Sequence, residues 1–259
     1  MARKVVQNCS SVGIIHRAEV PGWVFIETKT PGYPIPNYVG KGLLIGGNWV
    51  RPNAAKDGGP LGTYIREIRE ELTFGNVAVD PEEMNVLFGT GHLGQPAALR
   101  NITPSPEDEA ALATVVAAIE VRAEPFGAFI QTVDRSVFDM GNPKNRTGDY
   151  LGLVSVFQVP LQDDEWFTLV DLQEKYGNLS NESQTLITSV WDIVAKGVRI
   201  AWGQDLVLQE FFLRQGYKEA QGMPLMPRTQ VEKTPFGSSY EECMGKYEIE
   251  KIPEGVVRP

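Results

Sequence analysis

The sequence predicts a mixed α/β fold, because short β-rich runs and helical patterns follow one another along its 259 residues. The composition is that of an ordinary globular protein, with 42% hydrophobic and 22% charged residues. A chain of this length can bury a large core without disulfide or metal support. We therefore expect one large domain or two small ones.

Strands are expected where β-branched and aromatic residues gather between turn-forming residues. In chain order these runs are 12–17, 23–27, 42–45, 84–88 and 150–159. Pro21-Gly22 marks the turn between the first two runs, and Gly46-Gly47 ends the third. Residues 48–62 are rich in Gly, Pro and Asn and are expected to form a long loop.

Helices are expected where apolar residues recur three and four positions apart. In chain order these segments are 63–72, 105–121, 180–197 and 205–214. Ser105 and Pro106 are a typical N-cap and first helical residue for the second segment. In the third, Leu186, Val190 and Ile193 share one face.

The charge balance excludes one class of partner. Lysine plus arginine total 24 and aspartate plus glutamate total 33, which gives a net charge of −9. A protein that coats nucleic acid needs a basic surface, so we expect no such role. Small phosphorylated substrates remain compatible with this charge, because a divalent metal can neutralise both partners.

The cysteines and the N-terminus predict a cytoplasmic protein. Cys9 and Cys243 lie far apart and form no CxxC pair, which argues against a zinc site or a disulfide framework. The first residues lack the apolar core of a secretory signal. The longest apolar run, 110–119, is too short to span a bilayer, so we expect no membrane partner.

The expected helix at 63–72 is the most informative segment. At about 100° per residue, one stripe holds Ile65, Ile68 and Leu72. The opposite face clusters Glu67, Glu70 and Glu71. Each pair of like charges costs about 0.2–0.5 kcal/mol, and a hard cation such as Mg²⁺ would turn this cost into a gain. The alternative is a solvated acidic face whose charge Arg66 and Arg69 balance.

Residues 66–71, Arg-Glu-Ile-Arg-Glu-Glu, resemble the core of the Nudix box, G-x5-E-x7-R-E-U-x-E-E-x-G-U, where U is a bulky aliphatic residue. Three further features are similar to the family and come in the same order. They are the opening strand pair, the Gly46-Gly47 that closes an apolar run, and a late W-x-x-x-x-E-L segment at 166–172, with Asp171 in place of the glutamate. The resemblance covers roughly residues 10–92 and 149–200.

The sequence also departs from the family pattern. The spacing from Gly47 to Arg66 is five residues longer than the box requires. The position of the first box glutamate falls on Gly58, whose neighbour Asp57 is the candidate to replace it. The later box glycine is displaced to Gly75.

The resemblance implies a Nudix-type α/β/α sandwich with a mixed sheet over residues 1–216. An inserted segment near 93–148 interrupts this domain, and an extended C-terminal tail, 217–259, follows it. In this family such segments often build the substrate pocket or a dimer interface, so we also expect a weak homodimer. Removing 217–259 should then lower the oligomer mass.

The resemblance further implies hydrolysis of the pyrophosphate bond of a nucleoside diphosphate joined to another group. Mg²⁺ or Mn²⁺ would be bound by Glu67, Glu70, Glu71 and a backbone carbonyl of Gly46 or Gly47, while Arg66 would be structural. ADP-ribose, dinucleotide polyphosphates, NADH, nucleotide sugars and oxidised nucleotides all remain open as substrates. The alternative is that the chain is a catalytically inactive Nudix-fold protein with a nucleotide-binding or regulatory role.

The general base and the substrate contacts are less fixed by the pattern. The base is either a box glutamate or a late-loop acid, for which Asp164 and Glu165 are the candidates; a solvated acidic turn is the alternative reading. Trp49 is the candidate to stack on a base, unless it packs the loop, and Tyr64 is a second candidate. Candidate phosphate-facing cations are Arg51 and Lys56, or Lys144 and Arg146, each of which could equally be an ordinary surface charge.

Overall fold

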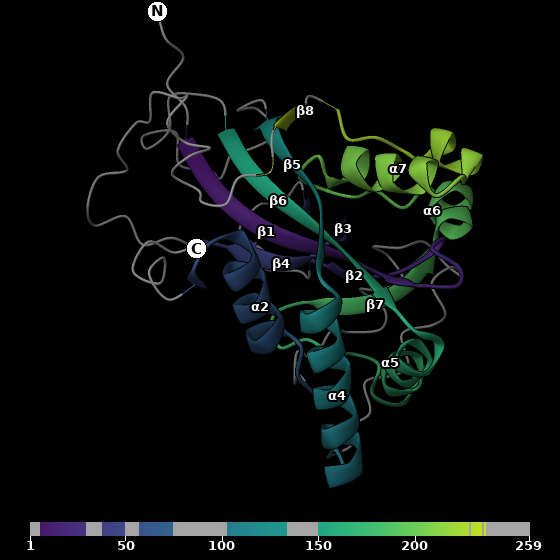
Figure 1. Ribbon diagram of the computed structural model, residues 1–259. Coiled ribbons are helices and arrows are strands. Elements are labelled where there is room, and N and C mark those ends of the chain that lie inside the picture. The colour runs from purple at the N-terminus through teal and green to yellow at the C-terminus, as the bar shows by residue number, and fades with distance from the viewer. Residues whose placement is uncertain are drawn as a thin grey trace, which may run out of the picture.

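The computed structural model describes residues 6–29, 38–49, 57–74, 103–133, 150–227, 229–234 and 236. Within these residues one mixed sheet is covered by helices on both faces (Figure 1). The predicted α/β class is therefore confirmed. Among the described helices, none is both long and apolar enough to cross a membrane.

The sheet has eight strands in the order β3-β2-β1-β6-β5-β8, with β4 paired to β1 and β7 paired to β2. Their bounds are β1 Val6–Arg17, β2 Trp23–Thr28, β3 Gly42–Leu43, β4 Ile45–Asn48, β5 Glu124–Val133, β6 Tyr150–Leu161, β7 Gln184–Ser189 and β8 Thr229–Thr234. The pairing of β1 with β6 is parallel, and the other pairings are antiparallel. The sheet is therefore mixed, as expected.

The two faces of the sheet carry separate cores. On one face lie α2 (Pro60–Glu71), α4 (Pro106–Arg122) and α5 (Asp163–Tyr176), and on the other lie α6 (Val190–Lys196) and α7 (Gln204–Arg214) (Figure 1). Alternation along a strand serves both cores. In β1, for example, Ile14 packs toward α7 and Ile15 packs toward α2.

Several predicted elements are confirmed. The opening strands pair as a hairpin, with Ile15 opposite Phe25. The second predicted helix is α4, where the Ser105 hydroxyl accepts a hydrogen bond from the backbone N–H of Asp108 at 3.2 Å. The acidic helix is α2, which begins three residues earlier than expected, at Pro60.

The predicted helix over 180–197 is wrong in its first half, which forms β7. This strand pairs along its whole length with β2, from Trp23↔Ser189 to Thr28↔Gln184. Only Val190–Lys196 is helical. The β-branched Ile187 and Thr188 suit a strand, and pairing with β2 overrides the helical spacing of the apolar residues.

The segments expected to be an insertion and a tail are built into the fold where they are described. From the insertion, β5 pairs along β6 and α4 supplies core residues. From the tail, the 3-10 helix η4 (Lys218–Gly222) and β8 follow α7, and Met223 is buried. Phe236 then packs edge-on against Phe157, on the α2 side of the sheet. The predicted strand at 84–88 and residues 237–259 lie outside the described residues.

Candidate functional site

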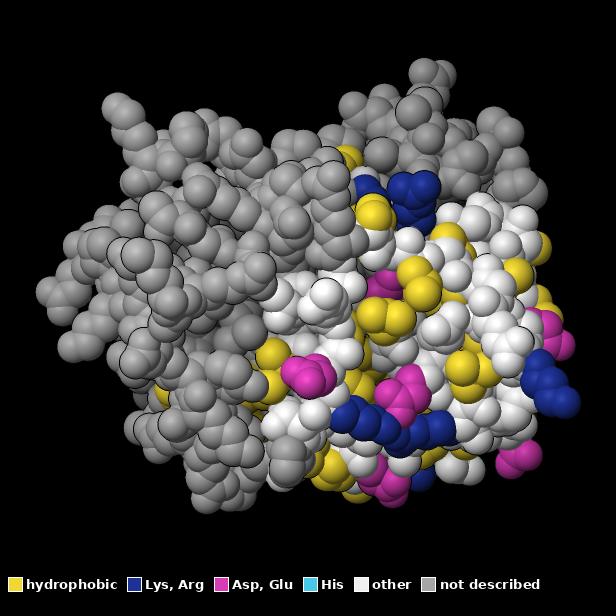
Figure 2. Space-filling view, turned by 90° about the horizontal axis from the view of Figure 1, so that it is seen from above, with side chains coloured by type: hydrophobic (Ala, Val, Ile, Leu, Met, Phe, Trp, Pro, Cys, Tyr) yellow, Lys and Arg dark blue, Asp and Glu magenta, His cyan; other side chains and the backbone are white. Residues whose placement is uncertain are grey.

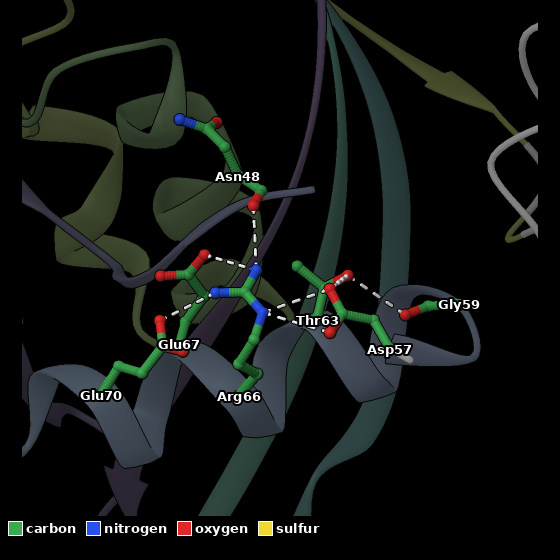
Figure 3. A network of polar contacts seen from close by, with 7 residues as sticks. All are labelled: Asn48, Asp57, Gly59, Thr63, Arg66, Glu67 and Glu70. Carbon is green, nitrogen blue, oxygen red and sulfur yellow. Dashed lines mark hydrogen bonds and ion pairs between the residues drawn. The ribbon is translucent and has the colours of Figure 1, made fainter. Parts of the chain in front are cut away.

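Arg66 is the hub of a polar network at the start of α2 (Figure 3). Its Nε donates to both oxygens of Asp57, at 3.1 and 3.2 Å. Its Nη2 donates to the backbone carbonyl of Asn48 at 3.1 Å and lies 2.8 Å from Glu67 Oε1. Its Nη1 donates to Glu70 Oε2 at 2.9 Å. One guanidinium thus joins α2, the end of β4 and Asp57 in the segment that leads into the helix.

Asp57 makes the contact to Arg66 that the sequence led us to expect. The side chain is buried, and it also accepts a hydrogen bond from the Thr63 hydroxyl at 3.2 Å. Thr63 donates in addition to the carbonyl of Gly59. Asp57 therefore fixes both the arginine and the entry to the helix, although the box's own glutamate position is occupied by Gly58.

Gly46 and Gly47 are required by two different close approaches. A Cβ on Gly47 would overlap the carboxylate of Glu67, which lies directly over the strand. A Cβ on Gly46 would overlap the carbonyl of Ser11, and its φ of 138° favours glycine. The Gly-Gly pair lies inside β4, with Gly47 opposite Ser11, and it brings the backbone up to α2.

The three glutamates of α2 differ sharply in exposure. The side chain of Glu70 is 59% exposed and that of Glu67 is 13% exposed, whereas Glu71 is only 4% exposed. The alternative reading, a solvated acidic face, is therefore wrong for Glu71, which shares the buried face of the helix with Ile68. The reason is that α2 contacts β4 and β1 and its end pairs with the loop before β7, so its buried face is wider than one apolar stripe.

Glu71 carries the least compensated charge of the site. Its Oε2 is buried and has no hydrogen-bond partner among the described residues. Burial raises the pKa of Glu71 well above its usual range, and the nearby carboxylates of Glu27 and Glu67 raise it further. Burial also raises the pKa of Glu67, although Arg66 partly offsets this effect.

Glu27 and Lys29 are site residues that the sequence reasoning missed. Glu27 is buried in β2, where its Oε1 lies 2.5 Å from Lys29 Nζ and its Oε2 accepts from the Ser183 hydroxyl at 2.5 Å. A glutamate at an inward position of an otherwise apolar strand is the signal that could have revealed it. Ser183 lies three residues after Ser180, whose backbone bridges to Leu72, so Glu27 lies close to the C-terminal end of α2.

The loop between α5 and β7 closes the C-terminal end of α2. Asn181 donates from Nδ2 to the Glu70 carbonyl at 2.8 Å and from its backbone N–H to the Glu71 carbonyl at 3.3 Å. The next residue, Glu182, is exposed and raises the pKa values of both Glu67 and Glu71. Glu182 is therefore the late-loop acid that the structure brings to the glutamates.

Asp164 and Glu165 lie elsewhere. They belong to the first turn of α5, just after Leu161, whose partner in β1 is Arg17. Gly47 pairs with Ser11, six residues earlier in β1, or about 20 Å away at 3.3 Å per residue. Glu165 is held by Arg122 at 2.8 Å. The structure does not bring these two acids together with the glutamates of α2.

The candidate substrate contacts have separate outcomes. Trp49 packs against the small cluster of Cys9 and Leu153, at the end of β4. Tyr64 cannot stack on a bound base, because it is fully buried and stacks on Phe157 with ring centroids 5.3 Å apart. The four candidate cations lie outside the described residues; they are Arg51, Lys56, Lys144 and Arg146.

The oxygen atoms of the site are of the kind that binds a hard divalent cation, but the side chains are not close enough together to hold one. Glu71 offers a buried oxygen without a partner, and Glu67 lies over the backbone of Gly47. Carboxylate and carbonyl oxygens are the ligands that Mg²⁺ and Mn²⁺ prefer. Among the described residues, however, no three acidic, histidine or cysteine side chains are grouped closely enough to hold a metal. Arg66 holds Glu67 and Glu70, and these side chains would have to turn to converge on one ion.

The chain was compared with protein-family models and with curated proteins. Neither comparison finds a match. The residues of the site are therefore the basis for any functional assignment.

Proposed function

We propose that this protein is a divalent-metal-dependent hydrolase of the Nudix type. Its reaction would be the cleavage of the pyrophosphate bond in a nucleoside diphosphate joined to another group. The observation that carries the proposal is the buried, unpartnered oxygen of Glu71 beside Glu67 and Glu27. Burying an ionised carboxylate without a partner is costly, and a bound cation would remove that cost.

In this proposal each residue of the site has a defined task. Glu67, Glu70 and Glu71 hold Mg²⁺ or Mn²⁺ together with a backbone carbonyl of Gly46 or Gly47. When bound, the metal would neutralise phosphate charge and lower the pKa of the attacking water. Arg66 and Asp57 keep α2 at a fixed distance from β4, so that the carboxylates face the Gly-Gly backbone.

The proton of the attacking water needs an acceptor within hydrogen-bond reach. Glu182 is better placed for this task than Asp164 or Glu165, since it acts electrostatically on Glu67 and Glu71. Its exposure also keeps it open to a substrate. We therefore assign the general base to Glu182, within the same proposal.

A binding protein without hydrolytic activity is the second candidate. The observation in its favour is that Arg66 occupies the carboxylates of Glu67 and Glu70, and that no metal-binding group is already formed among the described residues. Such a protein would bind a nucleotide through the same surface and leave it intact.

A hydrolysis screen tests the two candidates against each other. The protein is incubated with Mg²⁺ or Mn²⁺ and a panel of nucleoside diphosphate derivatives, and nucleoside monophosphate products are measured by chromatography. The double variant Glu70→Gln, Glu71→Gln runs beside it. Glu174→Gln is the matched control, because Glu174 is an exposed glutamate on α5, outside the site.

Metal-dependent cleavage that the double variant loses and Glu174→Gln keeps would support the enzyme. Glu182→Gln should then lower kcat about 100-fold or more, as expected for removal of a general base. Absence of cleavage, with panel ligands still raising the melting temperature, would overturn the enzyme and support the binding protein.

A further inference from the structure

Three cations lie side by side at the end of the sheet that carries Glu27. Lys29 directly follows β2 and Lys41 directly precedes β3, and the N–H of Lys29 donates to the carbonyl of Lys41 at 3.3 Å. Arg199 lies on the next segment, where its carbonyl accepts from the N–H of Gly42 at 2.9 Å. Three neighbouring backbones thus present Lys29, Lys41 and Arg199 at one level; we call these residues the cation row.

The cation row faces the α2 side of the sheet. Gly42 and Ile200 form a parallel bridge, and a Cβ on Gly42 would point at Ile200 and Ile26, which both belong to the core under α7. Successive side chains of a strand point to opposite faces, so Lys41 and Arg199 point to the α2 side. Lys29 lies on that side too, because it reaches Glu27 two residues earlier in the chain.

The positive charges of the row repel one another across neighbouring strands, and Glu27 offsets the charge at the Lys29 end. Like charges directly opposite one another on neighbouring strands destabilise a sheet. Burial lowers the pKa of Lys41, and the positive charge of Arg199 on the adjacent segment lowers it further. Among the residues that the structure describes, Arg199 has no ion-pair partner. A protein with a net charge of −9 has acidic residues in excess that could have balanced Arg199.

The backbone under the row is held in place from both sides. The Trp202 ring packs at a tilt against Tyr38 with ring centroids 4.6 Å apart, and Trp202 adopts a φ of 60°, which is uncommon for a residue with a side chain. Gln204 Oε1 accepts a hydrogen bond from the N–H of Leu44 at 2.7 Å. The segments that carry Lys41 and Arg199 are thus tied together, and such preorganisation favours binding because little order is lost on association.

We propose that the cation row, Lys29, Lys41 and Arg199, is an anion-binding subsite that takes phosphate groups of the substrate. Strand spacing of about 4.8 Å makes the row about 10 Å long, so it is longer than a single phosphate group. One end meets Glu27 at Lys29, and Arg199 forms the other end, beyond Lys41. The row therefore selects a phosphate chain that continues beyond the bond at the carboxylates.

This assignment rests on the proposed function for its substrate, but its test does not need hydrolysis. Binding of inorganic triphosphate, pyrophosphate and phosphate to the full chain is measured by calorimetry in the presence of EDTA. Triphosphate should bind the wild type most tightly. Lys41→Gln and Arg199→Gln should each raise the Kd for triphosphate about tenfold, since charge-assisted hydrogen bonds are lost. Lys218→Gln removes an exposed lysine on η4 and serves as the control with the same change of charge.

Equal Kd values for Lys41→Gln, Arg199→Gln and Lys218→Gln would overturn the subsite, even if the protein hydrolyses nucleotides. A selective loss in the first two variants would establish it, even if no hydrolysis is found. Lys29→Gln is not used, because it would leave Glu27 buried without its partner. The double variant Glu70→Gln, Glu71→Gln should keep triphosphate binding, which separates the subsite from the metal ligands.

Discussion

Gly46 and Gly47 avoid clashes with different groups, and the effects of replacing them should therefore differ. Gly46 has a positive φ and its Cβ would meet backbone, whereas the Cβ of Gly47 would meet only the end of the Glu67 side chain. Backbone cannot move aside cheaply, but a carboxylate can. Gly46→Ala should therefore cost about 1–3 kcal/mol of stability, and Gly47→Ala should leave the fold nearly unchanged.

Gly47→Ala should impair function although it leaves the fold nearly unchanged. In Gly47→Ala the displaced Glu67 should raise the metal concentration needed for hydrolysis about tenfold or more. Thermal unfolding and a metal titration of activity check both statements. A large loss of stability in Gly47→Ala would show that Glu67 cannot move, and would contradict this account of the Gly-Gly pair.

Asp205 is a buried carboxylate outside the site, and it makes stability depend on pH. Its Oδ2 accepts from the N–H of Met226 at 2.6 Å, whereas its Oδ1 is buried without a partner among the described residues. Burial raises the pKa of Asp205, and the backbone N–H groups of Met226 and Leu206 only partly offset this. The native state therefore binds the proton more tightly than the unfolded state does.

The sign of the effect follows from this difference. Stability should fall as the pH rises from about 4, the ordinary pKa of aspartate, through the raised pKa of the native state. Asp205→Asn keeps an acceptor for Met226 and removes the titration. Its melting temperature should therefore gain on that of the wild type between pH 4 and pH 7, and parallel curves across this range would contradict the prediction.

At the scale of elements, deletions in the C-terminal segment can show which of its residues the fold needs. β8 pairs with β5 from Ala128↔Thr234 to Val133↔Thr229, and Met223 and Met226 are buried before it. Burying one such side chain stabilises a protein by about 1.5–3 kcal/mol. Removing residues 223–259 should therefore lower the melting temperature by ten degrees or more, whereas removing 237–259 should change it little.

The shorter deletion also tests the expected homodimer. Removing 217–259 would destroy β8 and expose the edge of β5, so a change of mass would have two causes. Removing only 237–259 leaves the described strands intact. A lower mass of that variant in light scattering would support an interface in the tail, and an unchanged mass would contradict it.

Sequence reasoning succeeded for elements that local signals define. α4 has its serine cap and proline start within the chain itself, and the glutamates of α2 follow helical spacing. It failed where distant segments decide, as in β7, whose apolar spacing suited a helix until β2 provided a pairing partner. It also missed α5, although Gln162 and Glu165 form a capping box that was readable in the sequence.

The same division holds for the site. The Gly-Gly pair and the acidic helix were predictable because each motif lies within a few residues. Glu27, Lys29 and Glu182 were not, because their nearness to Glu71 comes from strand pairing and from the loop before β7. The burial of Glu71 was not predictable for a related reason, since helical spacing alone does not reveal how wide a buried face will be.

At the scale of the whole molecule, one parallel strand pair joins the two halves of the chain. β1 and β6 pair from Val6↔Tyr150 to Arg17↔Leu161. Strands β2 and β4, which carry Glu27 and the Gly-Gly pair, lie beside β1, and β5 lies beside β6. On the face seen in Figure 2, the described Lys and Arg side chains lie among Asp and Glu side chains and form no broad basic surface.

The buried charge of Glu71 links the site to the stability of the whole molecule. Without metal at pH 7.5, Glu71→Gln should raise the free energy of unfolding by about 1–3 kcal/mol, because the cost of ionising a buried carboxylate beside Glu27 and Glu67 is removed. With Mg²⁺ at about 100 times its Kd, the wild type should gain about 2.7 kcal/mol, or roughly 5–10 °C in melting temperature. The variant should gain little.

The order of the two melting temperatures should therefore reverse when Mg²⁺ is added. Thermal unfolding in EDTA and in Mg²⁺ measures this reversal, with Glu174→Gln as the control that should follow the wild type in both. A variant that stays above the wild type at every Mg²⁺ concentration would show that Glu71 binds no metal. In that case the buried carboxylate would serve the binding protein, whose ligand the cation row would still help to select.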